Sequence, residues 1–151
     1  MGDESVVIDI RNRQRLQRIS VAAVRSLVQA TLTELGCTGE IGIHFVGPAE
    51  MERVNWDFLR HVGSTDVITF DHGSSKTHLH GECFICVADA LKQATEFNTT
   101  WPEELGRYVI HGLLHLAGYD DVGPVARRLM KRRENSLTQR LVRTGDLQGK
   151  R

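Results

Sequence analysis

Apolar and polar positions alternate along "SVVIDI" at residues 5–10, a stretch rich in β-branched side chains, which predicts a first strand. Similar short patterns predict strands over 40–46 and 66–70, and the apolar run "ECFICVA" at 82–88 predicts a fourth. Between the last two, "DHGSSKTHLHG" at 71–81 is polar and rich in turn residues. This segment is predicted to be a loop or the tip of a hairpin.

Helical periodicity is strongest after residue 20, where apolar residues recur at 21, 24, 27, 28, 32 and 35. Ser20 is suited to cap this helix and Gly36 to end it. Pro48 is suited to begin a second helix that continues to residue 62. Further helices are expected over 89–97, 102–118 and 124–142. Because strands and helices do not alternate regularly after the start, the order predicts an α+β fold, a mixed sheet of about four strands with helices against it.

Chain length and charge bear on the number of domains and on possible partners. The 151 residues are expected to form a single domain, 1–151, and the formal net charge of zero gives no overall attraction to nucleic acid or membrane. The basic residues nevertheless cluster toward the two ends. Two explanations remain open, solvated helix faces or a local nucleic-acid contact. The clusters are Arg11, Arg13, Arg15 and Arg18, and then Arg127, Arg128, Lys131, Arg132, Arg133, Arg140 and Arg143.

The N-terminal residues and the cysteines bear on the compartment. The first residues are acidic and their apolar run is too short for a signal peptide or a membrane span, which predicts a cytoplasmic protein without membrane contact. Three cysteines favour reduced thiols over a disulfide framework. Cys83 and Cys86 form a C-x-x-C pattern inside a predicted strand, where they would point to opposite faces. A redox or zinc role for this pair is therefore disfavoured.

The stretch "HGLLHLAGYDD" at 111–121 carries the main candidate chemistry. His111 and His115 are one helical turn apart on one face of a helix that is otherwise apolar. Burying two imidazoles without partners would cost several kcal/mol. A metal ion bound to both rings would remove this cost. Gly118 can end the helix in a left-handed conformation, so that Asp120 or Asp121 could reach the same ion. The alternative is a pair of hydrogen-bonded core histidines.

Two histidines and one carboxylate are a known catalytic zinc set that leaves a position for water. In the H-E-x-x-H metalloproteases a glutamate follows the first histidine and acts as the general base. Here that position is Gly112, which has no side chain to do so. A peptidase of that type is therefore disfavoured.

The stretch also resembles the signature H-G-x-L-H-L-x-G-Y-D-H of the YbeY family of bacterial rRNA maturation endoribonucleases. "NWDFLRHVGSTDVITF" and "GECFIC" resemble two further motifs of this family, N-x-x-x-x-R…T-D-V-L-S-F and G-D-I-x-I-x, in the same order. Together these motifs cover most of the chain between Asn55 and Asp121. The N-terminal third and the C-terminal helix show only generic similarity.

The resemblance implies a zincin-like fold with a central metal-binding helix and one zinc ion. It implies hydrolysis of single-stranded RNA, not DNA, in 16S rRNA 3′-end maturation and ribosome quality control, with the small ribosomal subunit and its proteins as partners. His111 and His115 match the first two zinc ligands and count as catalytic residues. Arg60 matches an arginine that the family places beside the metal, where it would stabilise the charge that builds on a phosphodiester attacked by metal-activated water.

Two positions depart from the family pattern. Asp121 stands where the family has a third histidine ligand, and Glu82 stands where it usually has aspartate. A carboxylate ligand makes the site less positive, so Mn²⁺ or another divalent ion becomes an alternative to Zn²⁺. Asp120 is retained as an alternative ligand or as a partner just outside the ligand set.

The remaining expectations concern the substrate. Arg128 and Arg132 on the last helix are expected to contact RNA, whereas the general base is left unassigned. Two other functions stay open, a metal-dependent hydrolase of a non-RNA substrate and a ribosome-associated binding factor whose metal site is structural or lost.

Overall fold

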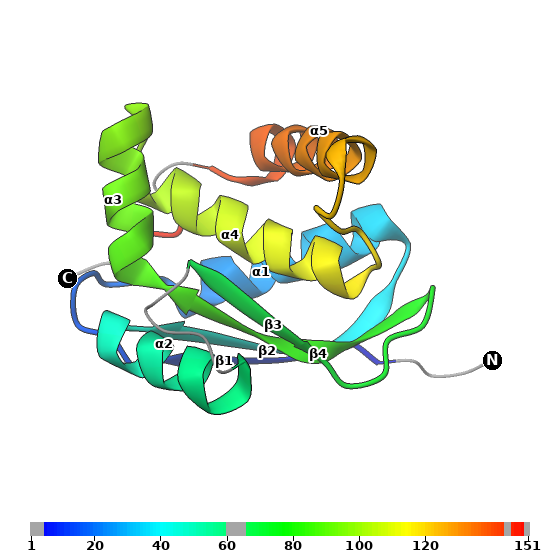
Figure 1. Cartoon of the computed structure of the whole chain (residues 1–151), viewed down its shortest axis with the longest axis horizontal. Coiled ribbons are helices and arrows are strands. Elements are labelled where there is room, and N and C mark those ends of the chain that lie inside the picture. The colour runs from blue at the N-terminus through cyan, green and yellow to red at the C-terminus, as the bar shows by residue number, and fades with distance from the viewer. Residues whose placement is uncertain (1–4, 60–65, 144–145, 150–151) are drawn as a thin grey trace.

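The computed structural model describes residues 5–59, 66–143 and 146–149. Its centre is a mixed four-stranded sheet in the order β1-β2-β4-β3 (Figure 1). β1 (Val7–Asn12), β2 (Thr38–Val46) and β4 (His78–Cys86) run parallel, and β3 (Val67–Asp71) pairs antiparallel with β4. The α+β fold with a mixed sheet of four strands is therefore confirmed.

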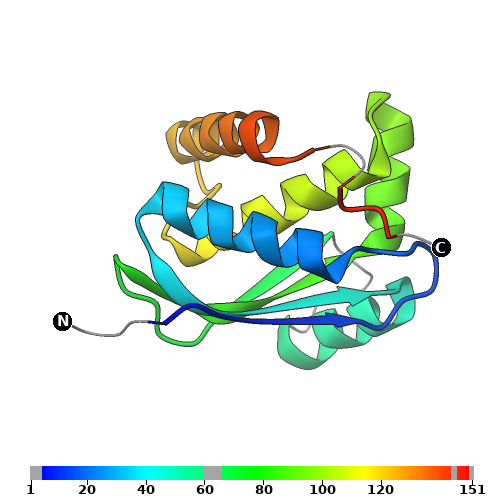
Figure 2. The ribbon, with the colours of Figure 1, turned by 180° about the vertical axis from the view of Figure 1, so that it is seen from behind.

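The helices cover the two faces of this sheet unequally. α1 (Val21–Leu35) and α4 (Trp101–Leu116) lie on one face, and α5 (Pro124–Leu141) packs on the outer side of α4 (Figures 1 and 2). α2 (Pro48–Val54) lies on the other face, while α3 (Val87–Phe97) follows β4 and packs against α4. Among the described residues, no helix is long and apolar enough to cross a membrane.

Several local predictions are confirmed. The Ser20 side chain accepts a hydrogen bond from the backbone N–H of Ala23 and caps α1, and Gly36 ends it at φ +69°. Cys83 and Cys86 point to opposite faces of the sheet. Cys83 lies in the main core beneath α1 and α4, whereas Cys86 lies in the smaller core beneath α2. The C-x-x-C pattern is thus two separate packing positions.

Two segments differ in detail from their predictions, and the predicted end of the first, residue 62, lies outside the described residues. The helix from Pro48 is α-helical only to Val54 and continues as a short π-helix, η1 (Asn55–Leu59). The segment 71–81 is not all loop, because β4 begins at His78. The reason is tertiary: β2 pairs with β4 from Thr38 to Val46, and the hydrogen bonds of this ladder order polar residues that look like a turn in isolation.

Glycines allow α4 to approach the sheet closely. A Cβ atom on Gly112 would lie 2.7 Å from Cys83 Sγ, and one on Gly81 would lie 2.6 Å from Leu116 Cδ2. Both distances are shorter than packed atoms tolerate. Gly112 therefore serves helix–sheet packing, and the same close approach holds the rest of α4, including its histidines, in a fixed position.

Candidate metal centre

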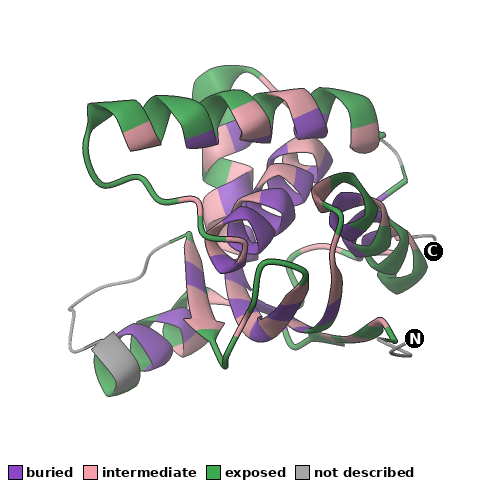
Figure 3. Ribbon diagram, turned by 90° about the vertical axis from the view of Figure 1, so that its right-hand side faces the viewer, coloured by how far each residue is buried: buried purple, intermediate pink, exposed green. Residues whose placement is uncertain are grey.

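The two histidines lie on the side of α4 that Gly112 does not occupy, beneath α5. The Nε2 atoms of His111 and His115 face one another at 3.1 Å, and the two rings are nearly perpendicular. Both side chains are half-buried, while most of the surrounding α4 residues are fully buried between the sheet and α5 (Figure 3). The predicted buried helix is confirmed, and two imidazole nitrogens point toward one location.

The turn after α4 brings an acid to these nitrogens. Gly118 adopts φ +101°, and the backbone N–H groups of Ala117, Gly118 and Tyr119 donate back to carbonyl groups of the last turn of α4. The chain reverses there, and a carboxylate oxygen of Asp121 and one nitrogen of each histidine all lie within 4.8 Å of one another.

The neighbouring Asp120 forms a hydrogen bond within the turn. Its Oδ1 accepts a hydrogen bond from the backbone N–H of Val122 at 3.0 Å, as in an Asx turn. The group of potential ligands contains Asp121 and not Asp120. Of the two acids left open by the sequence, the structure brings Asp121 to the histidines and uses Asp120 to shape the turn.

A further acid touches the site from α5 and was missed in the sequence. Glu134 is only 7% exposed, and its Oε1 lies 2.6 Å from His111 Nδ1. Its Oε2 accepts a hydrogen bond from Arg107 at 3.3 Å. One signal could have revealed it: Glu134 is the only acid between residues 122 and 145, and it falls on the apolar side of an otherwise basic helix, four positions after Met130.

The pKa shifts at the site favour a neutral His115 and an ionised Glu134. Burial lowers the pKa of His115, and the neighbouring His111 lowers it further against the opposing pull of Asp121 and Asp120. For Glu134, burial acts to raise the pKa, but the hydrogen bond from His111 and the charges of His111 and Arg107 outweigh it and lower the pKa. Neutral histidine and ionised carboxylate are the forms that bind metal ions.

The residues present fit a divalent ion. Zinc–nitrogen bonds of about 2.0–2.1 Å in tetrahedral geometry place two ligand nitrogens about 3.3 Å apart. The observed separation of 3.1 Å between the two Nε2 atoms is close to this value. A carboxylate beside Nδ1 of His111 favours the tautomer that leaves the lone pair of that ring on Nε2, the atom that faces His115.

The basic residues of α5 do not all face the same way. Arg132 precedes Glu134 by two positions, which rotates it about the helix axis by roughly 200° and away from the histidines. Arg128 is rotated almost as far, and both are exposed. Lys131 and Arg127 precede Glu134 by three and seven positions, so they lie on its side of the helix.

Other members of the basic cluster hold the fold together. Arg140 forms an ion pair with the Glu34 carboxylate at 2.6 Å, and Arg133 donates to the Glu34 carbonyl at 3.1 Å. These contacts join α5 to α1. Arg133 and Arg140 therefore each make a contact between helices, in addition to the alternatives that the sequence left open.

Two further sequence candidates remain, Arg60 and Glu82. Arg60 falls outside the described residues. Glu82 lies on the face of β4 opposite Cys83, where its two carboxylate oxygens are each 2.8 Å from a ring nitrogen, those of His44 and His72. The hydrogen bond to His72 is the main cause that lowers the pKa of Glu82. Glu82 therefore does not join the histidines of α4.

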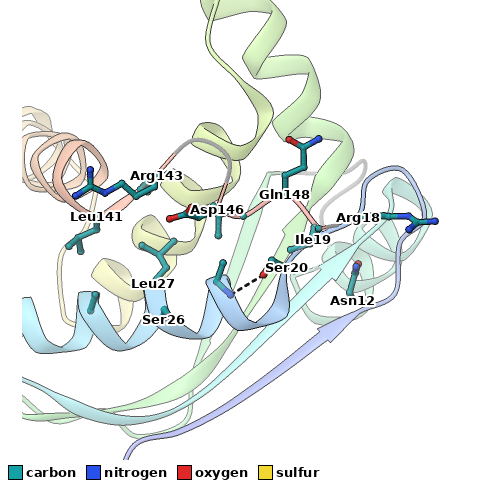
Figure 4. A pocket seen from close by; sticks show the side chains of 15 residues that line it. Asn12, Arg18, Ile19, Ser20, Ser26, Leu27, Leu141, Arg143, Asp146 and Gln148 are labelled. Atoms are coloured by element: carbon teal, nitrogen blue, oxygen red, sulfur yellow. Dashed lines mark hydrogen bonds between the residues drawn. The ribbon is translucent and has the colours of Figure 1, made fainter. Parts of the chain in front are cut away.

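A cavity of about 930 Å³ lies beside α1 (Figure 4). It is lined by one side of α1, the end of α5 and the chain that follows, including Ser26, Leu141 and Asp146. Neither His111 nor His115 lines it. The site with candidate chemistry is thus the histidine cluster and not this cavity.

Three comparisons relate the chain to known proteins. The family model described as "Endoribonuclease YbeY" matches residues 8–142. The Endoribonuclease YbeY of Chlorobium luteolum is 42% identical over 69% of this chain and 75% of its own length. That of Parabacteroides distasonis is 36% identical over 80% of this chain and 85% of its own. A solution structure of a Thermotoga maritima protein superposes with a TM-score of 0.68 at 24% identity, covering 89% of each chain, which supports the fold.

Proposed function

The chain belongs to the YbeY endoribonuclease family, and we propose that it is a metal-dependent endoribonuclease that cleaves single-stranded RNA. The observation that carries this proposal is the convergence of His111, His115 and Asp121 within 4.8 Å. These three side chains would hold one ion, Zn²⁺ or, because of the carboxylate, Mn²⁺. A bound ion would supply an activated water and a Lewis acid for the phosphoryl oxygen.

The chain's own residues perform the remaining tasks. The buried helix would hold the two imidazoles, and the turn at Gly118 would bring Asp121 to the same ion. We further propose that Arg60 donates hydrogen bonds to the non-bridging oxygens of the phosphodiester, as its place in the family motif implies. The biological substrate proposed is the 3′ end of 16S rRNA on the small ribosomal subunit in the cytoplasm, with a role in ribosome quality control.

Metal content tests the ligand set directly. We expect protein purified without added metal to contain one divalent ion per chain, measured by elemental analysis. Asp121→Ala is expected to lose most of that metal and to cleave single-stranded RNA more slowly, because only two ligands remain. Asp121→His restores three ligands and is expected to bind Zn²⁺ more selectively over Mn²⁺.

Two results would contradict this assignment. Metal that stays stoichiometric in Asp121→Ala would remove Asp121 from the ligand set. Metal and cleavage that appear only in Asp121→His would mean that this chain has departed from the hydrolytic chemistry and acts by binding. Asp120→Ala serves as the matched control, since it removes the adjacent acid, whose carboxylate accepts a backbone hydrogen bond.

Basic residues of α5 are proposed to contact the RNA backbone. Reversing Arg128 and Arg132 to glutamate is expected to weaken RNA binding at low salt. Reversing Arg127 and Lys131 is expected to weaken it more, because these residues lie on the side of α5 that faces the histidines. Each lost phosphate contact should reduce the slope of log affinity against log salt by about 0.7 for single strands. Unchanged affinity in both double variants would assign these charges to solvated surface.

A further inference from the structure

Glu134 connects the C-terminal helix to a proposed metal ligand. We propose that Glu134 is a positioning residue: its carboxylate holds the His111 ring in the tautomer and orientation that direct Nε2 toward the metal. The inference deepens the proposed function and rests on the metal centre assigned there. The contact that carries it is the 2.6 Å hydrogen bond between His111 Nδ1 and Glu134 Oε1.

The chemistry of imidazole explains why this contact matters. A neutral histidine carries one proton on either Nδ1 or Nε2, and only the nitrogen without the proton can bind a metal. Nε2 of His111 is the atom that faces Nε2 of His115. A carboxylate that accepts a hydrogen bond from Nδ1–H retains the proton there and leaves the Nε2 lone pair available.

Each oxygen of the Glu134 carboxylate has its own hydrogen-bond partner. Glu134 is 7% exposed, and Oε2 accepts from Arg107 while Oε1 accepts from His111. Nη1 of Arg107 also donates to Asn135, so one guanidinium nitrogen contacts two neighbouring side chains of α5. The Thr138 hydroxyl donates to the Glu134 carbonyl at 2.7 Å, which adds a side-chain contact to the backbone at this position. Glu134 is therefore positioned before it acts on His111.

This arrangement makes α5 part of the metal centre although α5 supplies no ligand. Asp121 precedes the helix and would bind the ion directly, whereas Glu134 lies within the helix and would act through His111. A competing explanation is that Glu134 only ties α5 to α4 through Arg107. That explanation predicts a change in stability when Glu134 is replaced, but no change in the tautomer of His111.

The test compares two buried glutamates. Glu134→Gln keeps the shape of the side chain, and Glu134→Leu removes the acceptor entirely. Glu104→Gln is the matched control, because Glu104 is 5% exposed, lies near Arg107 and accepts a hydrogen bond from Thr99 at 2.9 Å without touching a histidine. The affinity for Zn²⁺ is measured by chelator competition, and the His111 tautomer by nitrogen-15 NMR of the metal-free protein.

We expect both Glu134 variants to bind Zn²⁺ about 10–100-fold more weakly and to lose the predominant Nδ1–H form of His111. Glu104→Gln should keep the parent affinity and tautomer. The inference is overturned if Glu134→Gln and Glu134→Leu retain both properties, or if Glu104→Gln loses them equally. Zinc binding by the parent without RNA cleavage would contradict the proposed function and leave the inference intact, so the two failures can be told apart.

Discussion

His111→Ala protein is expected to lose RNA cleavage by about 10³-fold or more. His111 contributes one of three proposed ligands, and its removal also leaves the Glu134 carboxylate without its 2.6 Å partner in a buried setting. The ion that activates water and polarises the phosphoryl oxygen would then be lost or displaced. Single-turnover cleavage of a labelled single-stranded RNA, with metal content measured in parallel, checks this result.

His80→Ala is the matched control for that experiment. His80 has a side chain 44% exposed, lies on the opposite face of the sheet and pairs with Glu40 at 3.4 Å. Its replacement should leave both metal content and cleavage close to those of the parent. Full activity in a metal-free His111→Ala protein would contradict a catalytic metal, and a large loss of folding stability when the metal is removed from the parent protein would indicate a structural ion.

Gly112→Glu is expected to prevent the chain from folding stably. The substitution would place a carboxylate where even a Cβ atom would lie 2.7 Å from Cys83 Sγ, inside the fully buried contact between α4 and β4. Overpacking alone costs about 1–3 kcal/mol, and an unpaired buried charge adds several kcal/mol to this. Circular dichroism and urea unfolding should show loss of the cooperative transition.

Gly112→Ala provides the graded form of the same test. In an open helix, alanine would stabilise the protein by up to about 1 kcal/mol relative to glycine. Here we expect a net destabilisation of about 1–3 kcal/mol from the contact with Cys83. Combining it with Cys83→Ala removes Sγ and should recover part of this loss, seen as a favourable coupling energy in a double-mutant cycle. A stabilised Gly112→Ala protein would contradict the close packing at this position.

Much of the candidate metal centre could be predicted from local sequence. The i, i+4 spacing of His111 and His115 on an apolar helix fixes which side chains lie on one face, because the α-helix has a constant period. Gly118 likewise indicated a reversal of the chain, and the observed φ of +101° is open to glycine at little cost. Neither signal could choose between Asp120 and Asp121. That choice depends on which carboxylate accepts the Val122 N–H.

The start of β4 and the contact made by Glu134 could not be predicted from the sequence. The polar start of β4 was predicted as loop because its side chains favour turns, yet pairing with β2 made it strand. Glu134 is separated from His111 by 23 positions, and no local period relates two helices whose packing is set by the core between them.

The sequence by itself therefore determined the number and kind of the main elements, the buried character of α4 and the two histidines that face one location. These depend on backbone geometry that repeats over a few residues. The tertiary structure alone decided that Gly112 is a packing position, that Asp121 is the acid at the histidines and that Glu134 contacts His111. Each depends on atoms that the chain brings together only when β4, α4 and α5 pack.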